Sequence, residues 1–202
     1  MRPARPEDAG QLIELIHSSG PAAFDYGFAC PGHSARDFLR FCFLRGRGLF
    51  GWDNHAVIER DGQVLGVGSF YTADDYPSLN RHLVRQMLAF FPIRHWPGVI
   101  RRALQLAALL PPPERGELYV ANLGVRAEAR GQGAGAALLA QQHQAAVTRG
   151  LSRAALDVAV DNPRAEALYT RLGYRVVSER RFRGPPGRVP DARRMQLPLA
   201  AE

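Results

Sequence analysis

The sequence predicts an α/β fold, in which a mixed β-sheet is flanked by helices. Residues 118–125 are apolar and partly β-branched or aromatic, which is typical of a strand, and a glycine-rich turn leads from them into strong helix formers at 136–146. A second apolar run at 153–160 is followed by a segment with helix-start signals at 163–172. Strands that alternate with crossover helices pair in parallel, so we expect this half of the sheet to be parallel.

The first half of the sheet is expected to be antiparallel. Two β-rich runs, at 55–59 and 63–71, are separated by Arg60-Asp61-Gly62. Asp-Gly between two such runs is a strong signal for a hairpin turn. We therefore expect these runs to form paired strands that precede the central strand.

The N-terminal part of the chain predicts two helices ahead of this hairpin. A proline and two acids at 6–8 are typical of a helix N-terminus, and this helix is expected to end at Gly20. Ser34 can cap a second helix at 35–44. The chain between them, 21–33, contains glycines and prolines, and we expect it to be irregular.

A long segment at 72–113 separates the hairpin from the central strand. It is longer than the usual connection between strands, and its apolar residues recur at helical spacing over 77–91 and 98–110. Three prolines at 111–113 end the second of these helices. We interpret the segment as a helical insertion in a single domain that covers residues 1–202.

The C-terminal part predicts two more strands. Gly173 ends the helix at 163–172, and a strand is expected at 174–178. Glycines and prolines mark 183–191 as a loop, and 194–199 is expected to be the closing strand.

The composition favours an anionic ligand and predicts neither a metal site nor a membrane span. The formal net charge is +7, and all 26 basic residues are arginines because the sequence has no lysine. This charge suits a phosphate-bearing ligand and equally nucleic acid, but the arginines are spread along the chain, so we expect no nucleic-acid partner. Cys30 and Cys42 lack metal-ligand spacing, and no apolar run reaches the roughly 18 residues of a membrane span. Because residues 1–8 are charged and rich in proline, we expect no signal peptide. We expect a cytoplasmic protein with reduced thiols.

The glycine-rich turn has the features of an anion site. The helix at 136–146 is preceded by Arg130-Gly131-Gln132-Gly133-Ala134-Gly135. The first amides of a helix lack internal partners, and the helix dipole stabilises an anion there by roughly 0.3–1 kcal/mol. Glycines also let phosphate oxygens approach the backbone. The spacing fits neither a P-loop nor a dinucleotide fingerprint. The alternative is a helix that packs closely on its strand.

Two motifs resemble those of a known enzyme family. Arg130-x-x-Gly133-x-Gly135, placed after an apolar strand, resembles the acetyl-CoA signature (Q/R)-x-x-G-x-(G/A) of the GNAT superfamily of N-acetyltransferases. Downstream, the family's Asn…Ala…Leu-Tyr…Gly-Phe/Tyr segment is matched by Asn162-x-x-Ala165-x-x-Leu168-Tyr169-x-Arg171-Leu172-Gly173-Tyr174. The order and spacing make the match specific over 117–180. The resemblance implies a GNAT-type sheet, in which the central strand splays from its neighbour.

The resemblance also implies acetyl-CoA as cosubstrate. The amides of the turn would hold the pyrophosphate, and the end of the preceding strand would pair with pantetheine. Arg130 would add charge near the phosphates, or would be a solvated loop residue. Asn162 would hydrogen-bond the coenzyme, or would only cap its helix. The cofactor-binding residues predicted in this way are Leu123, Gly124, Val125, Arg130, Gly131, Gln132, Gly133, Ala134, Gly135 and Asn162.

Glu117 and Tyr169 are the catalytic residues that the resemblance implies. An amine with a pKa of about 10.4 carries a proton that a base must remove. Glu117 matches the position of the glutamate that serves as base in some family members, or is an exposed residue at the start of a strand. Tyr169 matches the family's tyrosine near the sulfur and would act as the acid for the leaving thiolate, or would be a core residue.

We therefore expect an N-acetyltransferase that moves an acetyl group from acetyl-CoA to a primary amine by direct attack. The alternative is a non-catalytic, CoA-binding module with the same fold. The acceptor is open between a small molecule and a peptide. The segment at 72–113 is expected to add core or a dimer surface, so that a homodimer is allowed for, or else to cover the acceptor as a lid.

Overall fold

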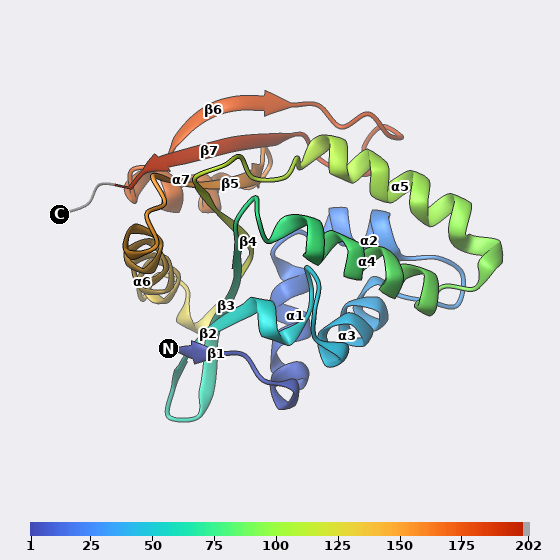
Figure 1. Cartoon of the computed structure of the whole chain (residues 1–202), viewed down its shortest axis with the longest axis horizontal. Coiled ribbons are helices and arrows are strands. Elements are labelled where there is room, and N and C mark those ends of the chain that lie inside the picture. The colour runs from blue at the N-terminus through green and yellow to red at the C-terminus, as the bar shows by residue number, and fades with distance from the viewer. Residues whose placement is uncertain (200–202) are drawn as a thin grey trace.

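The computed structural model describes residues 1–199 and contains a seven-stranded sheet in the order β1-β2-β3-β4-β5-β7-β6 (Figure 1). The strands are β1 (Arg2–Pro3), β2 (His55–Arg60), β3 (Gln63–Tyr71), β4 (Glu117–Val125), β5 (Arg153–Ala159), β6 (Arg175–Arg180) and β7 (Ala192–Pro198). All neighbours pair antiparallel except β4 and β5, which are parallel. The predicted mixed sheet is therefore confirmed.

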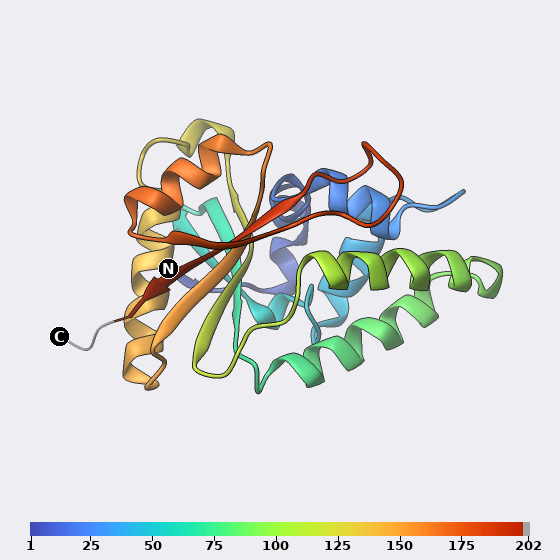
Figure 2. The same ribbon diagram turned by 90° about the horizontal axis from the view of Figure 1, so that it is seen from above.

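Helices cover both faces of this sheet (Figures 1 and 2). They are α1 (Ala9–Ser18), α2 (Pro21–Phe28), α3 (Ala35–Arg45), α4 (Tyr76–Phe90), α5 (Trp96–Leu109), α6 (Ala134–Thr148) and α7 (Pro163–Arg171). Successive residues of β4 pack on opposite faces of the sheet. Leu118 and Val120 share a core with α6 and α7, whereas Tyr119 packs toward α4. The sheet therefore separates an α6–α7 layer from a layer made by α1 to α5.

The hairpin of β2 and β3 forms where the sequence predicts it. Asp61 and Gly62 have φ angles of 51° and 77°, so that both turn residues are in the left-handed region. A two-residue type I′ turn requires this conformation, and Asp-Gly is among the pairs that adopt it most readily.

Residues 21–28 form helix α2, where the sequence predicts irregular chain. Pro21 stands in the first turn of α2, where its missing N–H costs nothing, so that Gly20-Pro21 ends one helix and begins the next. Phe24 and Phe28 are buried, and their rings lie 5.6 and 5.7 Å from that of Phe50. Packing of these aromatic side chains stabilises a helix that the local sequence does not indicate.

The long segment before the central strand forms the two helices expected at 77–91 and 98–110. They are α4 and α5, which lie on the same side of the sheet (Figure 2). Leu109 of α5 shares a small core with Tyr26 of α2 and with Val189, which precedes β7. The segment is therefore packed against both α2 and the β6–β7 connection.

The strands β4 and β5 separate after four residue pairs. The parallel register ends at Val120 and Leu156, whereas β4 continues to Val125 and β5 to Ala159. Beyond Val120, the edge of β4 that faces β5 has no strand partner in the described chain. This is the splayed central sheet that the resemblance implies.

A β-bulge in β4 lies at the start of this separation. The register of the β3–β4 pair skips between Val67 and Ser69, where Asn122 and Leu123 together oppose one residue of β3. Asn122 has a φ of 54°, a left-handed conformation that asparagine adopts more readily than most residues. Leu123 consequently packs on the α6–α7 side, although regular alternation from Tyr119 would place it on the opposite face.

We predict that Gly124→Ala destabilises the fold. An added Cβ would overlap the carbonyl oxygen of Leu15, so that α1 or β4 must move. Overpacking of this kind costs about 1–3 kcal/mol, which thermal or urea unfolding would measure. Gly10→Ala is the control, because no atom lies within 4 Å of a Cβ at that position in α1. Its stability should stay level or rise by up to about 1 kcal/mol. Equal stabilities of the two variants would contradict the assigned contact.

Candidate active site

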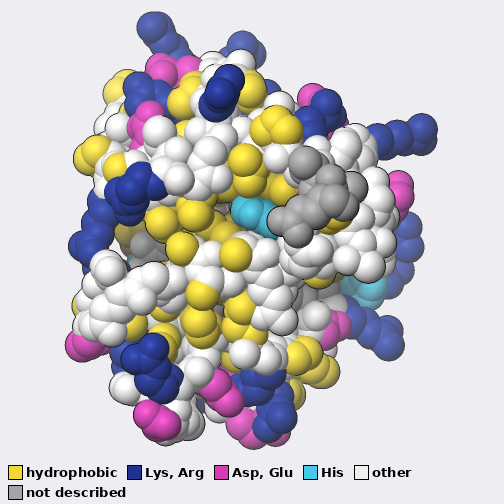
Figure 3. Space-filling model, turned by 90° about the vertical axis from the view of Figure 1, so that its left-hand side faces the viewer, with side chains coloured by type: hydrophobic (Ala, Val, Ile, Leu, Met, Phe, Trp, Pro, Cys, Tyr) yellow, Lys and Arg dark blue, Asp and Glu magenta, His cyan; other side chains and the backbone are white. Residues whose placement is uncertain are grey.

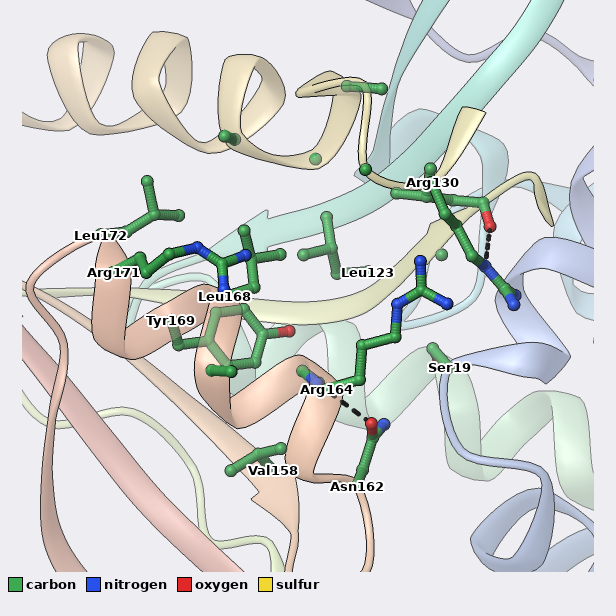
Figure 4. Close-up of a pocket in the computed structure, with 18 of the residues that line it drawn as sticks. Ser19, Leu123, Arg130, Val158, Asn162, Arg164, Leu168, Tyr169, Arg171 and Leu172 are labelled. Carbon is green, nitrogen blue, oxygen red and sulfur yellow. Dashed lines mark hydrogen bonds between the residues drawn. The ribbon is translucent and has the colours of Figure 1, made fainter. Parts of the chain in front are cut away.

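A cavity of about 740 Å³ lies where β4 and β5 separate. Its walls are the end of β4, the turn before α6, the end of β5, α7, and Ser18 and Ser19 at the end of α1 (Figure 4). Every predicted site residue except Gln132 and Glu117 lines it. On the molecular face shown in Figure 3, arginine side chains are dispersed rather than gathered in one patch.

The turn before α6 leaves its amides open. Gly131 and Gly133 have φ angles of 80° and 83°, a conformation that strains other residues, and an added Cβ at either would meet no atom within 4 Å. Among residues 1–199, no protein acceptor engages the amides of Gly131, Gly133, Ala134 or Gly135. These amides and the N-terminal end of the α6 dipole are therefore suited to bind an anion.

Close packing of α6 on β4 does not account for these glycines. Gly135 is the nearest of them to β4, and an added Cβ there would make only an ordinary contact with Val125, at 3.4 Å. The backbone conformation at Gly131 and Gly133 is what requires glycine in the turn.

The end of β4 forms the wall next to this turn. Leu123, Gly124 and Val125 line the cavity beyond the last pair with β5. Backbone N–H and C=O groups are obligatory hydrogen-bonding groups, so a free strand edge of this kind can pair with an extended ligand. Gly124 has a second constraint, its close approach to α1.

Three predicted polar side chains are engaged by the backbone. Nε of Arg130 donates to the carbonyl of Val125 at 3.0 Å. Oδ1 of Asn162 accepts from the amide of Ala165 at 3.1 Å and so caps α7 (Figure 4). Gln132 bonds back to the preceding turn through Nε2, outside the cavity. In the described chain, Nδ2 of Asn162 has no protein acceptor and is available to a ligand.

Helix α7 contributes two arginines that sequence reasoning missed. Arg164 and Arg171 line the cavity, and Figure 4 shows Arg164 reaching across it toward Arg130. Their spacing of two helical turns, which places them on one face of α7, was the available signal. Apart from these three guanidinium groups, Asp157 is the one charged residue in the described wall. The cavity therefore favours an anionic ligand.

Tyr169 presents a neutral phenol to the cavity. Its side chain is buried, and burial raises the pKa of Tyr169 to about 12. The ring lies 5.8 Å from that of Tyr174 in the core beneath α7. Figure 4 shows the hydroxyl pointing into the cavity, where no described residue accepts its hydrogen bond. The hydroxyl is therefore free to donate to a ligand.

Glu117, the predicted base, lies outside the cavity with its side chain 0% exposed. Its Oε1 accepts from Nε2 of Gln196 at 2.6 Å, and its Oε2 accepts from the amide of Glu114 at 2.9 Å. Arg153 and Arg194 add ion pairs at 3.6 and 3.9 Å. A carboxylate with both oxygens engaged in this way connects β4 to β5 and β7. Because Glu117 does not line the cavity, the geometry does not favour its predicted role as base.

Asp157, which sequence reasoning missed, is an acidic residue at the fork, the point where β5 separates from β4. It follows Leu156, the last β5 residue paired with β4, and it contributes to the cavity wall. Its side chain is 2% exposed; Oδ2 accepts from the hydroxyl of Tyr119 at 2.7 Å, and Oδ1 accepts from Nε of Arg194 at 3.0 Å. Burial raises the pKa of Asp157, and Arg194 opposes the rise. Its signal was a single acid in the apolar run 153–160.

The part of the chain that the structure describes holds no group of three or more His, Cys, Asp or Glu residues placed to bind a metal ion. Cys30 and Cys42 are free thiols. Within residues 1–199, no helix combines the length and the apolar character that crossing a membrane requires.

Comparisons with known proteins agree with this geometry. The family model described as "Acetyltransferase (GNAT) family" matches residues 25–174. An N-acetyltransferase from Staphylococcus aureus Mu50 superposes with a TM-score of 0.69 at 17% identity, over 97% of this chain and 98% of that one. Another solved acetyltransferase gives 0.63 at 20% identity, over 98% of both chains. A ribosomal-protein-alanine N-acetyltransferase from Brucella melitensis gives 0.56 at 19% identity, over 98% of both. No curated protein matches the sequence.

The match at 25–174 spans more than half of the 202 residues and contains the open turn, the splayed strands and Tyr169. The solved structures share the fold over nearly the whole chain. The chain therefore belongs to the GNAT acetyltransferase family, and it is an acetyl-CoA-dependent N-acetyltransferase.

Proposed function

We propose that the protein transfers the acetyl group to a primary amine by direct attack at the fork between β4 and β5. Asp157 accepts the proton of the incoming ammonium group, and Tyr169 donates to the departing thiolate. The main support is the cavity, which is lined by an open helix N-terminus, a free strand edge, a buried carboxylate and a buried phenol.

The residues around the cavity fit acetyl-CoA. The amides from Gly131 to Gly135 and the α6 dipole hold the pyrophosphate, while Arg130 and Arg164 add positive charge beside it. Nothing lies within 4 Å of a Cβ at Gly131, so phosphate oxygens have room there. The edge of β4 at 123–125 pairs with the amides of the pantetheine arm. The bound coenzyme supplies a thioester, whose carbonyl carbon is the electrophile.

Asp157 is suited to accept the proton. An alkylammonium group has a pKa of about 10.4 and must lose its proton before nitrogen can attack. Burial raises the pKa of Asp157 and so makes its carboxylate a stronger base than an exposed one. Its side chain is 2% exposed and the residue lines the cavity, so in this proposal the amine approaches it through the cavity, directly or through one water.

Tyr169 is suited to stabilise the departing thiolate. Its pKa of about 12 keeps the phenol protonated at neutral pH. A thiol, with a parent pKa of about 8.5, is a stronger acid than this phenol. We therefore assign Tyr169 a hydrogen bond that strengthens as negative charge develops on sulfur, and the thiolate takes its final proton where it reaches solvent.

The residues outside the cavity receive other roles in this proposal. Glu117, on β4, is joined to β7 by its hydrogen bond from Gln196 and to β5 by its ion pair with Arg153, and it takes no part in proton transfer. The acceptor is a primary amine of unidentified structure. A homodimer and a cytoplasmic location stay predictions.

Two measurements test the proposed function. Calorimetry should detect acetyl-CoA binding, and thiol release from acetyl-CoA should rise with at least one amine from a panel of spermidine, lysine and a peptide with N-terminal alanine. The peptide is included because a structural neighbour is named as a ribosomal-protein-alanine N-acetyltransferase. Absence of binding, or release that no amine increases, would contradict the proposal.

We predict that Gly133→Ala weakens acetyl-CoA binding about tenfold. A Cβ at its φ of 83° costs roughly 1–2 kcal/mol, and relief of this strain turns the amides away from the phosphates. Gly150→Ala is the matched control, because its φ is 76° and its Cβ would also meet nothing within 4 Å, outside the cavity. Both variants should lose similar stability, and only the first should lose affinity in calorimetry. Equal affinities would show that the turn does not bind the coenzyme.

We predict that Asp157→Asn lowers kcat about 10²- to 10⁴-fold while acetyl-CoA affinity is kept, because general-base catalysis is lost. In the native enzyme only the ionised carboxylate is a base, and its pKa is raised, so activity falls as the pH drops through that pKa. This acid limb of the pH–rate profile should vanish in the variant. Glu117→Gln, which alters a buried acid outside the cavity, should keep the limb. If Glu117→Gln removes it instead, the base is misassigned.

We predict that Tyr169→Phe lowers kcat about 10- to 1000-fold with an unchanged Kd for acetyl-CoA, because one donor to developing negative charge is removed. Tyr174→Phe serves as the control, since it deletes a neighbouring buried hydroxyl that bonds His143 rather than facing the cavity. Stopped-flow or steady-state thiol release measures both. Equal losses in the two variants would assign Tyr169 to the core alone.

A further inference from the structure

Tyr119 is a buried residue beside Asp157 that has no role in the mechanism proposed above. It lies on β4 opposite Ala155, one pair before the parallel register ends. Its side chain is almost fully buried, and its hydroxyl donates to Oδ2 of Asp157 at 2.7 Å. The phenol therefore reaches from the central strand to the carboxylate at the fork.

Other groups hold the second oxygen of Asp157. Nε of Arg194, on β7, donates to Oδ1 at 3.0 Å, and Nη1 of Arg180, on β6, lies 3.9 Å from the same oxygen. Tyr71 of β3 is the remaining titratable neighbour, with its ring 5.2 Å from that of Tyr119. Each carboxylate oxygen thus has its own donor, from a different strand, and each keeps a further lone pair for a proton.

Arg194 is fixed by more than Asp157. Its Nη2 donates to the carbonyl of Pro111 at 2.5 Å, its guanidinium lies 5.0 Å from the centre of the Tyr119 ring, and it pairs with Glu117 at 3.9 Å. Loss of Arg194 would therefore disturb several strands at once. The one side-chain hydrogen bond of Tyr119 in the described chain is the bond to Asp157.

We propose that Tyr119 is a positioning residue for acetyl transfer, whose hydroxyl fixes the carboxylate of Asp157 at the fork and favours its ionised form. The inference rests on the proposed function, in which Asp157 accepts the proton of the amine. Tyr119 itself exchanges no proton with the substrate and acts only through Asp157.

The physical reason is the effect of a hydrogen-bond donor on a buried acid. Burial raises the pKa of Asp157, while the donors Arg194 and Tyr119 lower it. Burial also raises the pKa of Tyr119 well above its usual value, so its hydroxyl stays protonated and remains a donor at neutral pH. When this donor is removed, less opposes the effect of burial, so the pKa of Asp157 rises further. As the pH is lowered, the carboxylate is then protonated, and stops acting as a base, at a higher pH than in the native enzyme.

The test is Tyr119→Phe, which keeps the ring and removes the hydroxyl. Tyr71→Phe is the matched control, because it removes a buried hydroxyl from the neighbouring strand that does not bond Asp157. The first readout needs no acceptor: the side-chain carboxyl ¹³C signals of aspartate-labelled protein are followed through a pH titration. The signal of Asp157 is identified by its absence in Asp157→Asn.

We expect the titration midpoint of Asp157 to move up by about one to two pH units in Tyr119→Phe, and not to move in Tyr71→Phe. With an amine that supports turnover, the acid limb of kcat/KM should move by the same amount. The Kd for acetyl-CoA should stay near that of the native enzyme.

The outcomes separate this inference from the proposed function. An unmoved midpoint in Tyr119→Phe, or an equal shift in both tyrosine variants, overturns the positioning role. If the midpoint moves as expected but Asp157→Asn keeps the native pH–rate profile, then Tyr119 does set the state of Asp157, and the assignment of Asp157 as base is the part that fails.

Discussion

The early end of the β4–β5 ladder is the constraint on which the rest of the site depends. Backbone N–H and C=O groups require partners, and a parallel ladder continued to Val125 would supply them from within the sheet. Because pairing stops at Val120 and Leu156, the edge of β4 stays available and a cavity opens beside it. An exposed strand edge is usually a liability that proteins cover, whereas here it forms a wall of the cavity.

The bulge at Asn122 decides on which face of the sheet the side chains at the end of β4 lie. Strict alternation along β4 would place Leu123 on the same face as Tyr119, toward α4. One extra residue reverses the alternation, so that Leu123 joins the α6–α7 layer and Gly124 meets α1. An apolar segment such as 118–125 indicates a strand from its composition, but a bulge changes neither composition nor length in a recognisable way. The strand was therefore predictable from the sequence, whereas the side of the sheet on which the residues after the bulge lie was not.

The site divides in the same way between local and distant causes. The open turn could be predicted because positive φ angles at Gly131 and Gly133 are a property of the glycines themselves. The helix cap by Asn162 is likewise local. By contrast, Glu117 resembles an exposed strand-start residue until Gln196, 79 positions later, covers it. Asp157 was overlooked for the converse reason: its importance comes from the point at which β5 leaves β4, which only the assembled sheet defines.

The sheet also decides how protons can move in the proposed reaction. Tyr169 belongs to the α6–α7 core with Leu156, whereas Asp157 bonds Tyr119, which packs on the opposite face. Successive residues of a strand point to opposite faces, so the base and the thiolate donor lie on different sides of β5. No described hydrogen bond links them across it. The two residues line one cavity but share no hydrogen bond, so the proton that Asp157 takes from the amine does not pass to the sulfur through Tyr169. Burial alone raises the pKa of Tyr169, whereas the pKa of Asp157 also depends on its donors Arg194 and Tyr119, so the two groups can be tuned separately.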